Sequence, residues 1–290
     1  MPELPEVEVV RRGLVELLPG LKITGASSSW DKSFPNAKAD VDTFLIGSKI
    51  ADVRRRAKVL IIDLDAGYSL IIHLKMTGQL VFRSDDDSKK FGAGHPTNSL
   101  LGNLPDKSTR VIIELTSAKL FFNDQRKFGW VRLVPTIEIP NIDFFKKVGP
   151  EPLSAEFTDR IFLKRIKKRA GSTIKAALLD QTVLAGVGNI YADESLWGAK
   201  IHPATRVKDV PDAKLKKLFT ELQYVLKLSI EKGGSTDRNY VNAKGKKGSY
   251  MQFARVFRRE NLPCPRCGTT IEKTKVAGRG THTCPTCQKI

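Results

Sequence analysis

The spacing of apolar residues divides the chain into a strand-rich first half and a helix-rich second half. Alternating or continuous apolar positions predict strands at 49–55, 59–64 and 68–74. Three further strands are predicted at 110–115, 119–123 and 130–134. A continuous apolar run such as 59–64 indicates a strand that is buried on both faces, as between two packed sheets. A β-sandwich reaching to about residue 135 accounts for this pattern.

The period changes to that of a helix after Gly149-Pro150-Glu151-Pro152, which we interpret as a stiff linker at a domain boundary. Helices are predicted at 155–169, 173–181, 190–199 and 211–232. The polar stretches 84–109 and 235–250 contain few apolar anchors and are predicted as loops. The fold class is therefore α+β. Its predicted parts are 1–135, a linker at 136–154, a helical domain at 155–235 and a C-terminal region at 236–290.

The first residues predict a helix that fixes the N-terminus to the folded body. Its apolar face consists of Val7, Val10, Leu14, Leu17 and Leu18. Pro5 suits the first turn, and Glu6 places acid at the positive end of the helix. Removal of Met1 would leave Pro2 as a secondary amine, and a nearby helix N-terminus would favour its unprotonated, nucleophilic form. Glu3 could then serve as an acid or base, although an ordinary capped helix start explains the same residues.

The charge of the chain indicates a polyanionic partner. The formal net charge is +18 and the basic residues are spread along the whole sequence. Nucleic acid is the usual partner of such a protein, and a membrane surface is the weaker alternative. Because no apolar run approaches the length of a membrane span, we expect a soluble, cytoplasmic protein.

The four cysteines predict a metal site. They form two Cys-x-x-Cys pairs, Cys264 with Cys267 and Cys284 with Cys287, near the end of the chain. Two such pairs can face each other and bind one zinc ion as a closed tetrahedral four-cysteine site. Redox-active pairs are the alternative interpretation. A closed site leaves no position for a substrate, so the expected zinc is structural.

The sequence Met1-Pro2-Glu3-Leu4-Pro5-Glu6-Val7-Glu8 resembles the N-terminus of the formamidopyrimidine-DNA glycosylases, which are bifunctional base-excision repair enzymes. The resemblance implies that the amine of Pro2 attacks C1′ of a damaged nucleotide and that Glu3 assists. Arg54-Arg55-Arg56-Ala57-Lys58 is similar to the Arg-Arg-x-Lys segment of the family. This similarity implies that Lys58 contacts a phosphate and acts as an acid in β-elimination, whereas a solvated strand edge is the ordinary interpretation of such a run.

Two further segments carry the resemblance, His73–Gly78 and Asn123–Gly129. By similarity to the family, Met76, Arg126 and Phe128 fill the space that an extruded nucleotide leaves in the duplex. A cation with fork geometry and two apolar wedges suit such a gap. From the sequence alone, core packing also explains Met76 and Phe128.

The resemblance also assigns the helical and C-terminal parts. Gly186-Val187-Gly188-Asn189 is similar to part of the family's helix–two-turns–helix element, in which Asn189 would bind the DNA backbone. Lys175 is a candidate phosphate contact, and Lys246 in the predicted lesion-capping loop is another candidate DNA contact. Arg279, between the two cysteine pairs, would bind a phosphate at the lesion and take part in the second elimination.

The sequence departs from the family pattern at Ser108, where histidine is common, and in Phe257-Arg258, where the family usually has Tyr-Gly. Residues 84–105 also form a longer segment than is typical. None of these departures affects Pro2 or Glu3.

The resemblance implies an N-terminal catalytic β-sandwich, a helix–two-turns–helix domain and a zinc finger, which together bind duplex DNA as a monomer. The implied reaction is removal of 8-oxoguanine or formamidopyrimidines, followed by β,δ-elimination at the abasic site. Association with the nucleoid follows from DNA binding. Two alternatives stay open: an endonuclease VIII-like enzyme that acts on oxidised pyrimidines, and a zinc-finger DNA-binding protein without catalytic activity.

Overall fold

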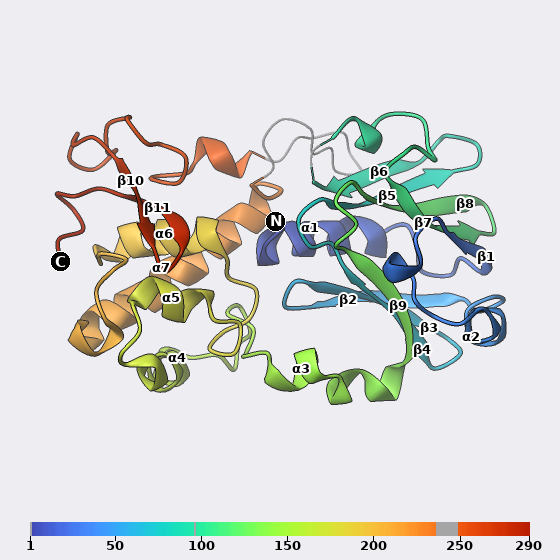
Figure 1. Cartoon of the computed structure of the whole chain (residues 1–290), viewed down its shortest axis with the longest axis horizontal. Coiled ribbons are helices and arrows are strands. Elements are labelled where there is room, and N and C mark those ends of the chain that lie inside the picture. Colours follow the sequence, from blue (N-terminus) through green and yellow to red (C-terminus); the bar gives the residue numbers. More distant parts are fainter. Residues whose placement is uncertain (1, 96, 236–248) are drawn as a thin grey trace. The chain divides into compact units, whose positions relative to one another are not determined.

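The computed structural model describes residues 2–95, 97–235 and 249–290. The chain forms two compact units, shown in Figure 1. The first unit contains residues 1–146 and 232–249, and the second contains residues 147–231 and 250–290. Each unit has its own hydrophobic core.

The first unit is built on two antiparallel sheets. The five-stranded sheet has the order β1-β7-β8-β5-β6 and the four-stranded sheet has the order β2-β3-β4-β9. The strands of the larger sheet are β1 Ile23–Ser28, β5 Gly78–Ser84, β6 Lys90–Gly94, β7 Thr109–Leu115 and β8 Ala118–Asp124. Those of the smaller sheet are β2 Ile50–Arg56, β3 Val59–Leu64, β4 Tyr68–His73 and β9 Trp130–Pro135.

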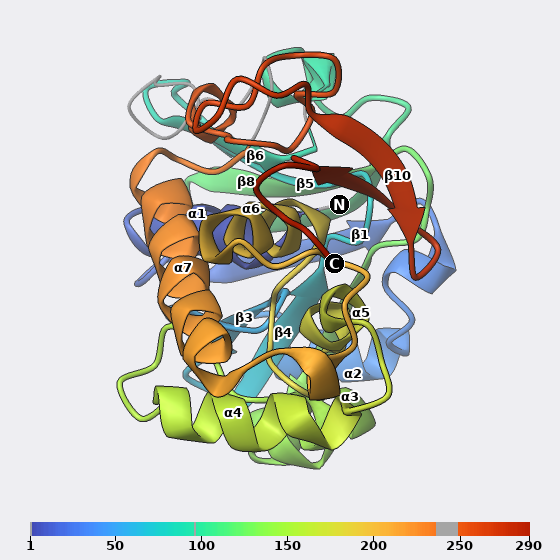
Figure 2. The same ribbon diagram turned by 90° about the vertical axis from the view of Figure 1, so that its left-hand side faces the viewer.

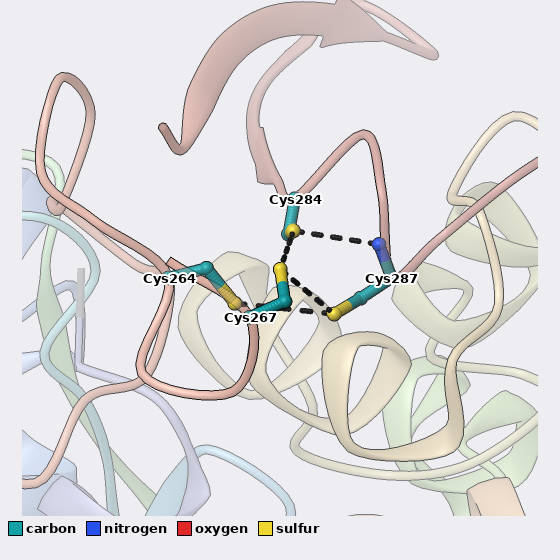
Figure 3. A group of neighbouring side chains, drawn as sticks. All are labelled: Cys264, Cys267, Cys284 and Cys287. Atoms are coloured by element: carbon teal, nitrogen blue, oxygen red, sulfur yellow. Dashed lines mark hydrogen bonds between the residues drawn. The ribbon is translucent and has the colours of Figure 1, made fainter. Parts of the chain in front are cut away.

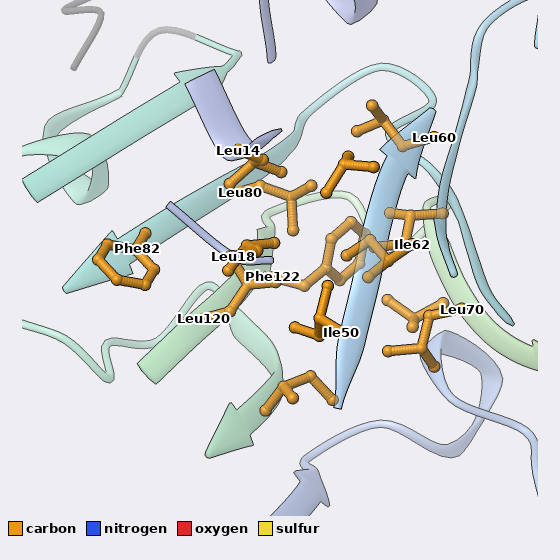
Figure 4. Close-up of a cluster of buried hydrophobic side chains, with 14 of the residues drawn as sticks. Leu14, Leu18, Ile50, Leu60, Ile62, Leu70, Leu80, Phe82, Leu120 and Phe122 are labelled. Carbon is orange, nitrogen blue, oxygen red and sulfur yellow. The ribbon is translucent and has the colours of Figure 1, made fainter. Parts of the chain in front are cut away.

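Side chains from both sheets fill the core between them, as Figure 4 shows. Ile62 and Leu70 enter it from the smaller sheet, and Leu80 and Phe122 enter it from the larger sheet. Helix α1, Leu4–Val15, adds Leu14 to the same core. The predicted β-sandwich with a flanking helix is therefore confirmed.

The continuous apolar run of β3 is buried on both faces, as predicted, but only one of these faces lies against a sheet. On the outer face, Val59 and Ile61 pack with Ile139 and Phe144. These residues lie on the 3₁₀ helix η3, Thr136–Asn141, and on the short helix α3, Asp143–Lys147. The linker segment therefore covers the sheet.

Sequence patterns missed part of the sandwich. The predicted loop 84–109 is wrong at β6, where Phe91 and Ala93 are buried while glycines occupy alternate positions. Strand β1 was not predicted either, because its start has only one apolar residue, Ile23. The remaining residues of the strand are half-exposed or exposed. Helix α2, Lys38–Phe44, buries only Val41.

The helices of the second unit pack around an apolar cluster of side chains. Figure 2 shows the ribbon of these helices. The helices are α4 Asp159–Ile166, α5 Ile174–Leu179, α6 Asn189–Ala199 and α7 Asp212–Glu231. The predicted helix 155–169 is shorter than expected, because Thr158 caps its start and a 3₁₀ turn at Lys167–Arg169 ends it. Among the described residues, no helix is long and apolar enough to cross a membrane.

A two-stranded ribbon follows, formed by β10 Glu272–Val276 and β11 Arg279–Thr283. Its turn consists of Ala277 and Gly278, which have φ angles of 49° and 74°. Positive φ at both positions matches the right-handed twist of the paired strands. Arg279 is the first residue after this turn and is exposed.

Candidate functional site

Strand register brings several candidate residues to one end of the sandwich. Val59, next to Lys58, pairs with His73 at the end of β4, and His73 pairs with Trp130 at the start of β9. In the other sheet, Gly78 pairs with Asp124. The β2–β3 turn and the segments 74–77 and 125–129 therefore emerge at the same end of this unit.

The N-terminus is held by a capping box. Glu3 caps α1, and its backbone N–H donates to the carboxylate of Glu6 at 2.8 Å. The other oxygen of Glu6 accepts a hydrogen bond from the backbone of Ser235 at 2.9 Å. Pro2 is buried, and the side chain of Glu3 is 4% exposed. The terminal residues are therefore fixed in a partly dehydrated setting, in which a charged or reactive group is strongly influenced by its neighbours.

The basic run before Lys58 is organised by ion pairs. Arg54 pairs with Asp63 on the adjacent strand at 2.5 Å, and Arg55 pairs with Glu8 of α1 at 3.2 Å. Burial alone would raise the pKa of Glu8, but hydrogen bonds and charges from Arg11, Arg12 and Arg55 hold it below its usual value. The run is thus only partly the solvated strand edge that its composition suggests. Lys58 itself is 7% exposed.

His73 is a buried, uncharged member of this end of the sandwich. Burial and the nearby charges of Lys75 and Lys58 lower the pKa of His73 to about 3. Its Nδ1 accepts a hydrogen bond from the backbone of Lys75 at 3.0 Å, which places the ring proton on Nε2. An imidazole in this state is a neutral hydrogen-bond donor at physiological pH.

The three predicted void-filling residues lie together. The Arg126 guanidinium donates to Met76 Sδ at 3.1 Å and lies 4.8 Å from the ring centre of Phe128. Met76 and Phe128 are 41% and 52% exposed, which is unusual for large apolar side chains. Core packing, the alternative interpretation, does not describe them.

Asp124 connects the two segments that carry these residues, and sequence analysis missed it. This carboxylate is fully buried and accepts hydrogen bonds from the hydroxyl of Thr77 and from the backbone of Arg126 and Gly129. A buried carboxylate with several donors is a strong positional constraint. Its only signal in the sequence was its place at the end of a strand.

In the second unit, Asn189 and the β10–β11 ribbon are joined by hydrogen bonds. Asn189 is the first residue of α6, and its amide donates to the carbonyl of Gly280 at 2.9 Å. Asn189 Oδ1 is buried and accepts no hydrogen bond from the described residues. The helix predicted at 190–199 is present and begins one residue earlier, at this asparagine.

Lys175 lies in the interior and is not exposed on a helix face. Its Nζ is 2.6 Å from Asp193 and also donates to Gly280 O and Thr281 Oγ1. The other oxygen of Asp193 accepts from the backbone of His282. The predicted contact of Lys175 with a phosphate stays a prediction, but the observed contacts hold the ribbon beside α5 and α6.

The sequence departures have local explanations. Ser108 is buried and hydrogen-bonds to Asp106. Arg258, where the family usually has glycine, has a φ of 55°, so the turn keeps a conformation that glycine favours. Lys246 lies outside the described residues.

The four cysteines form one cluster, drawn in Figure 3. Their sulfur atoms all lie within 4.8 Å of one another, and the pairs Cys267–Cys284 and Cys264–Cys287 are 3.4 and 4.0 Å apart. Zn–S bonds of about 2.3 Å in a tetrahedron separate the sulfurs by roughly 3.8 Å. The cluster therefore fits one four-coordinate zinc ion. His282 is not part of it, because its Nδ1 lies on Asp193.

Glu194 attaches the zinc module to α6 and was also missed from the sequence. The Glu194 side chain is fully buried, and its carboxylate accepts backbone hydrogen bonds from Arg255, Val256 and Phe257 at 2.8–3.0 Å. The Arg266 guanidinium lies 3.8 Å from the ring centre of Trp197 on the same helix. The finger is thus bonded to the helical core.

Three family models match consecutive parts of the chain. The formamidopyrimidine-DNA glycosylase N-terminal domain matches residues 1–131, and the corresponding H2TH domain matches residues 148–240. A zinc finger found in these enzymes and in isoleucyl-tRNA synthetases matches residues 261–290.

Relatives match over their whole length. Formamidopyrimidine-DNA glycosylases of Pelotomaculum thermopropionicum and Pediococcus pentosaceus are each 41% identical over 292 residues, covering 100% of both chains. A solved Lactococcus lactis enzyme bound to DNA that contains Fapy-dG is 34% identical, with a TM-score of 0.87 and complete coverage of both chains. MutM bound to DNA with carbocyclic 8-oxo-G is 33% identical, with a TM-score of 0.86 and the same coverage.

The fold and the site thus define a zinc-finger DNA-repair protein with a β-sandwich and an H2TH domain. This chain belongs to the formamidopyrimidine-DNA glycosylase family. It is a base-excision repair DNA glycosylase with one structural zinc site.

Proposed function

We propose that this protein excises oxidised purines from duplex DNA through an iminium intermediate on Pro2 and then cleaves the strand at the abasic site. The main support is the position of Pro2 and Glu3, which are buried at the start of α1. A zinc-bearing DNA-binding protein without activity would need no such arrangement. The names and DNA ligands of the relatives support oxidised purines as the substrate class.

The bond changes begin at the nitrogen of Pro2. This nitrogen forms a bond to C1′ while the glycosidic bond breaks and the damaged base leaves with a proton. Glu3 donates a proton to O4′ as the sugar ring opens, which leaves an iminium ion between Pro2 and C1′. Loss of a C2′ proton then expels the 3′ phosphate, and a second elimination expels the 5′ phosphate.

Lys58 contributes a cation for the first elimination. Its ammonium stabilises the leaving 3′ phosphate and supplies a proton, as expected of a general acid. His73, at the end of the strand that pairs with Val59, offers a neutral Nε2–H donor nearby in the same sheet. Asn189, Arg279 and Lys246 contribute phosphate contacts in this proposal, with Arg279 also assisting the second elimination.

Met76, Arg126 and Phe128 replace the extruded nucleotide in the duplex. Their mutual contacts and high exposure support this role. Lys175 acts indirectly, because its contacts to Gly280 and Thr281 hold the ribbon that carries Arg279.

Zinc would be held by Cys264, Cys267, Cys284 and Cys287 and would stabilise the module without taking part in the reaction. The protein acts as a monomer on duplex DNA, and we infer a cytoplasmic, nucleoid-associated location from that substrate. One solved Lactococcus lactis relative is bound to DNA that contains an oxidised pyrimidine, so that lesion class belongs in the test.

Borohydride trapping on duplexes with defined lesions tests the proposal. The mature protein should form a covalent complex with 8-oxoguanine and formamidopyrimidine duplexes, and less with oxidised pyrimidines. A form that retains Met1 should bind DNA without trapping, because its Pro2 nitrogen is an amide. Pro2→Gly keeps a primary amine and should retain some trapping.

Glu3→Gln separates base excision from the later steps. It should slow release of the damaged base sharply, while attack on a preformed abasic site should suffer less because no base needs to leave. Normal trapping by the form with Met1 would place the nucleophile elsewhere, with Lys58 as the next candidate.

A further inference from the structure

A continuous set of hydrogen bonds runs from helix α1 to the turn that carries Lys58. It begins at Glu8, five residues after Glu3 on the N-terminal helix. Glu8 accepts from Arg55 Nε at 3.2 Å, and Arg55 Nη1 donates to the carbonyl of Ala57 at 2.7 Å. Ala57 is bonded directly to Lys58, so the set ends at the residue before the proposed general acid.

The turn at Ala57 has a strained conformation that the Glu8–Arg55 hydrogen bonds can stabilise. Arg56 pairs with Val59, which leaves Ala57 and Lys58 as a two-residue loop between β2 and β3. Ala57 has a φ of 53°, although it carries a side chain, and it is completely buried. Alanine adopts this conformation at a cost in free energy, so the surrounding contacts must maintain it.

The Glu8–Arg55 ion pair is largely buried, so solvent screens it little. The side chains of Arg55 and Glu8 are 11% and 13% exposed. Charge-assisted hydrogen bonds of this kind are less screened than surface pairs, and the planar guanidinium can hold a carboxylate and a carbonyl at the same time. By contrast, the neighbouring Arg54 is 43% exposed and pairs with Asp63 of the adjacent strand within the sheet.

We propose that Glu8 and Arg55 are positioning residues that fix Lys58 relative to helix α1, which begins directly after Pro2 and Glu3. This inference rests on the function proposed above for Lys58. The nucleophile would then lie directly before the first turn of α1, and the second turn of the same helix would set the position of the general acid. Elimination would depend on the Glu8–Arg55 pair, whereas iminium formation would not.

Single-turnover assays on a duplex with one preformed abasic site test the separation. Arg55→Gln should slow strand cleavage by about 10- to 100-fold, the usual effect of displacing a reacting group by about 1 Å. The rate of borohydride trapping should stay within about twofold. Glu8→Gln should have the same selective effect, and the double variant should be no slower than Arg55→Gln alone.

Arg54→Gln is the matched control, because it removes the same charge from the adjacent position on the same strand. It should leave cleavage and trapping unchanged. Arg55→Lys guards against a folding defect: it keeps the charge beside Glu8 but cannot hold both acceptors, so cleavage should be intermediate with wild-type thermal stability. Equal losses of trapping and cleavage in Arg55→Gln, or cleavage within about twofold of wild type, would overturn the inference.

A Lys58→Met background separates this inference from the proposed role of Lys58. If Arg55 acts through Lys58, Arg55→Gln should have no further effect on cleavage in that background. Wild-type cleavage by Lys58→Met would instead contradict the role of Lys58. Amide hydrogen exchange at residues 57–59 would then test whether Arg55 stabilises the turn. Exchange should be faster in Arg55→Gln, and an unchanged rate would refute the positioning role of Arg55.

Discussion

Lys175 Nζ lies 2.6 Å from the carboxylate of Asp193, and both side chains are completely buried. Removing one partner of such a pair leaves a charge in the interior, so Lys175→Met should lower the free energy of unfolding by about 3–5 kcal/mol. Urea denaturation measures this loss. Lys167→Gln, which breaks an exposed pair with Asp212, should cost less than about 1 kcal/mol.

The salt dependence of DNA binding separates two roles for Lys175. If the residue acts only by holding the ribbon that carries Arg279, Lys175→Met should cause no further reduction in the slope of log K against log salt in an Arg279→Ala background. A further reduction of the slope by about one in that background would make Lys175 a direct phosphate contact.

Loss of zinc should unfold the C-terminal module and abolish lesion binding. Structural zinc supplies about 10–16 kcal/mol in isolated finger peptides, more than the short β10–β11 ribbon can replace. Cys267→Ser or chelation should therefore abolish the protection of the amides of 261–290 against hydrogen exchange. The sandwich, whose core contains none of these residues, should keep its melting transition. Full duplex affinity after complete zinc removal would contradict this expectation.

Arg126→Ala should reduce discrimination between bases opposite the lesion. A bidentate contact to a base edge contributes about 1–3 kcal/mol of selectivity, which its loss would remove. The measurement is a set of binding constants for one lesion opposite each of the four bases. Arg279→Ala, which removes a proposed phosphate contact at an exposed arginine, should weaken all four duplexes alike. A uniform loss with Arg126→Ala would limit this residue to general positioning.

Stability should fall with acid because His73 is held neutral. The pKa of His73 is about 3 in the folded protein, against about 6.5 when unfolded, so the unfolded state binds one more proton between these values. This contribution is complete above pH 6.5 and is lost as pH falls toward 3, at about 1.4 kcal/mol per pH unit.

Comparing His73→Gln with wild type isolates this group. Glutamine can still accept the hydrogen bond from Lys75 but does not titrate. Between pH 7 and pH 5, wild type should lose about 2 kcal/mol more unfolding free energy than the variant. Parallel pH profiles for the two proteins would refute the assignment.

Gly129 has no room for a side chain. A Cβ at this position would lie 2.7 Å from the ring of Phe122 and 2.9 Å from the carbonyl of His73. Gly129→Ala should therefore cost about 1–3 kcal/mol and disturb the neighbouring Phe128. Thermal unfolding measures the effect. Gly171→Ala, where no atom lies within 4 Å, should change stability by less than about 0.5 kcal/mol.

The pattern of apolar residues predicted those helices and strands whose buried positions are occupied by apolar side chains at a regular spacing. The run Val59–Leu64 and the stripe of α7 are examples, and both were found where expected. Strand β6 was missed because glycines interrupt it and its register comes from pairing with β5. The residues of β6 alone do not indicate which strand they will pair with.

The candidate site residues also divide into those that the sequence predicted and those that it did not. Paired cysteines have a spacing that indicates metal binding, and the terminal proline is conspicuous by position. Asp124, Asp193 and Glu194 were not predicted, because a buried carboxylate is recognised only from the donors that surround it. Those donors come from residues up to 89 positions away, as with His282 and Asp193.

The register of the sandwich separates its two ends. The segments with Lys58, Met76 and Arg126 leave one end, whereas the turns at 65–67, 85–89 and 116–117 leave the other. Turns of the second group can change in length or composition without moving the segments that carry the proposed site residues. Changes in turn length are thus physically separated from the proposed chemistry, so this scaffold can vary at one end while the end with the proposed site keeps its geometry.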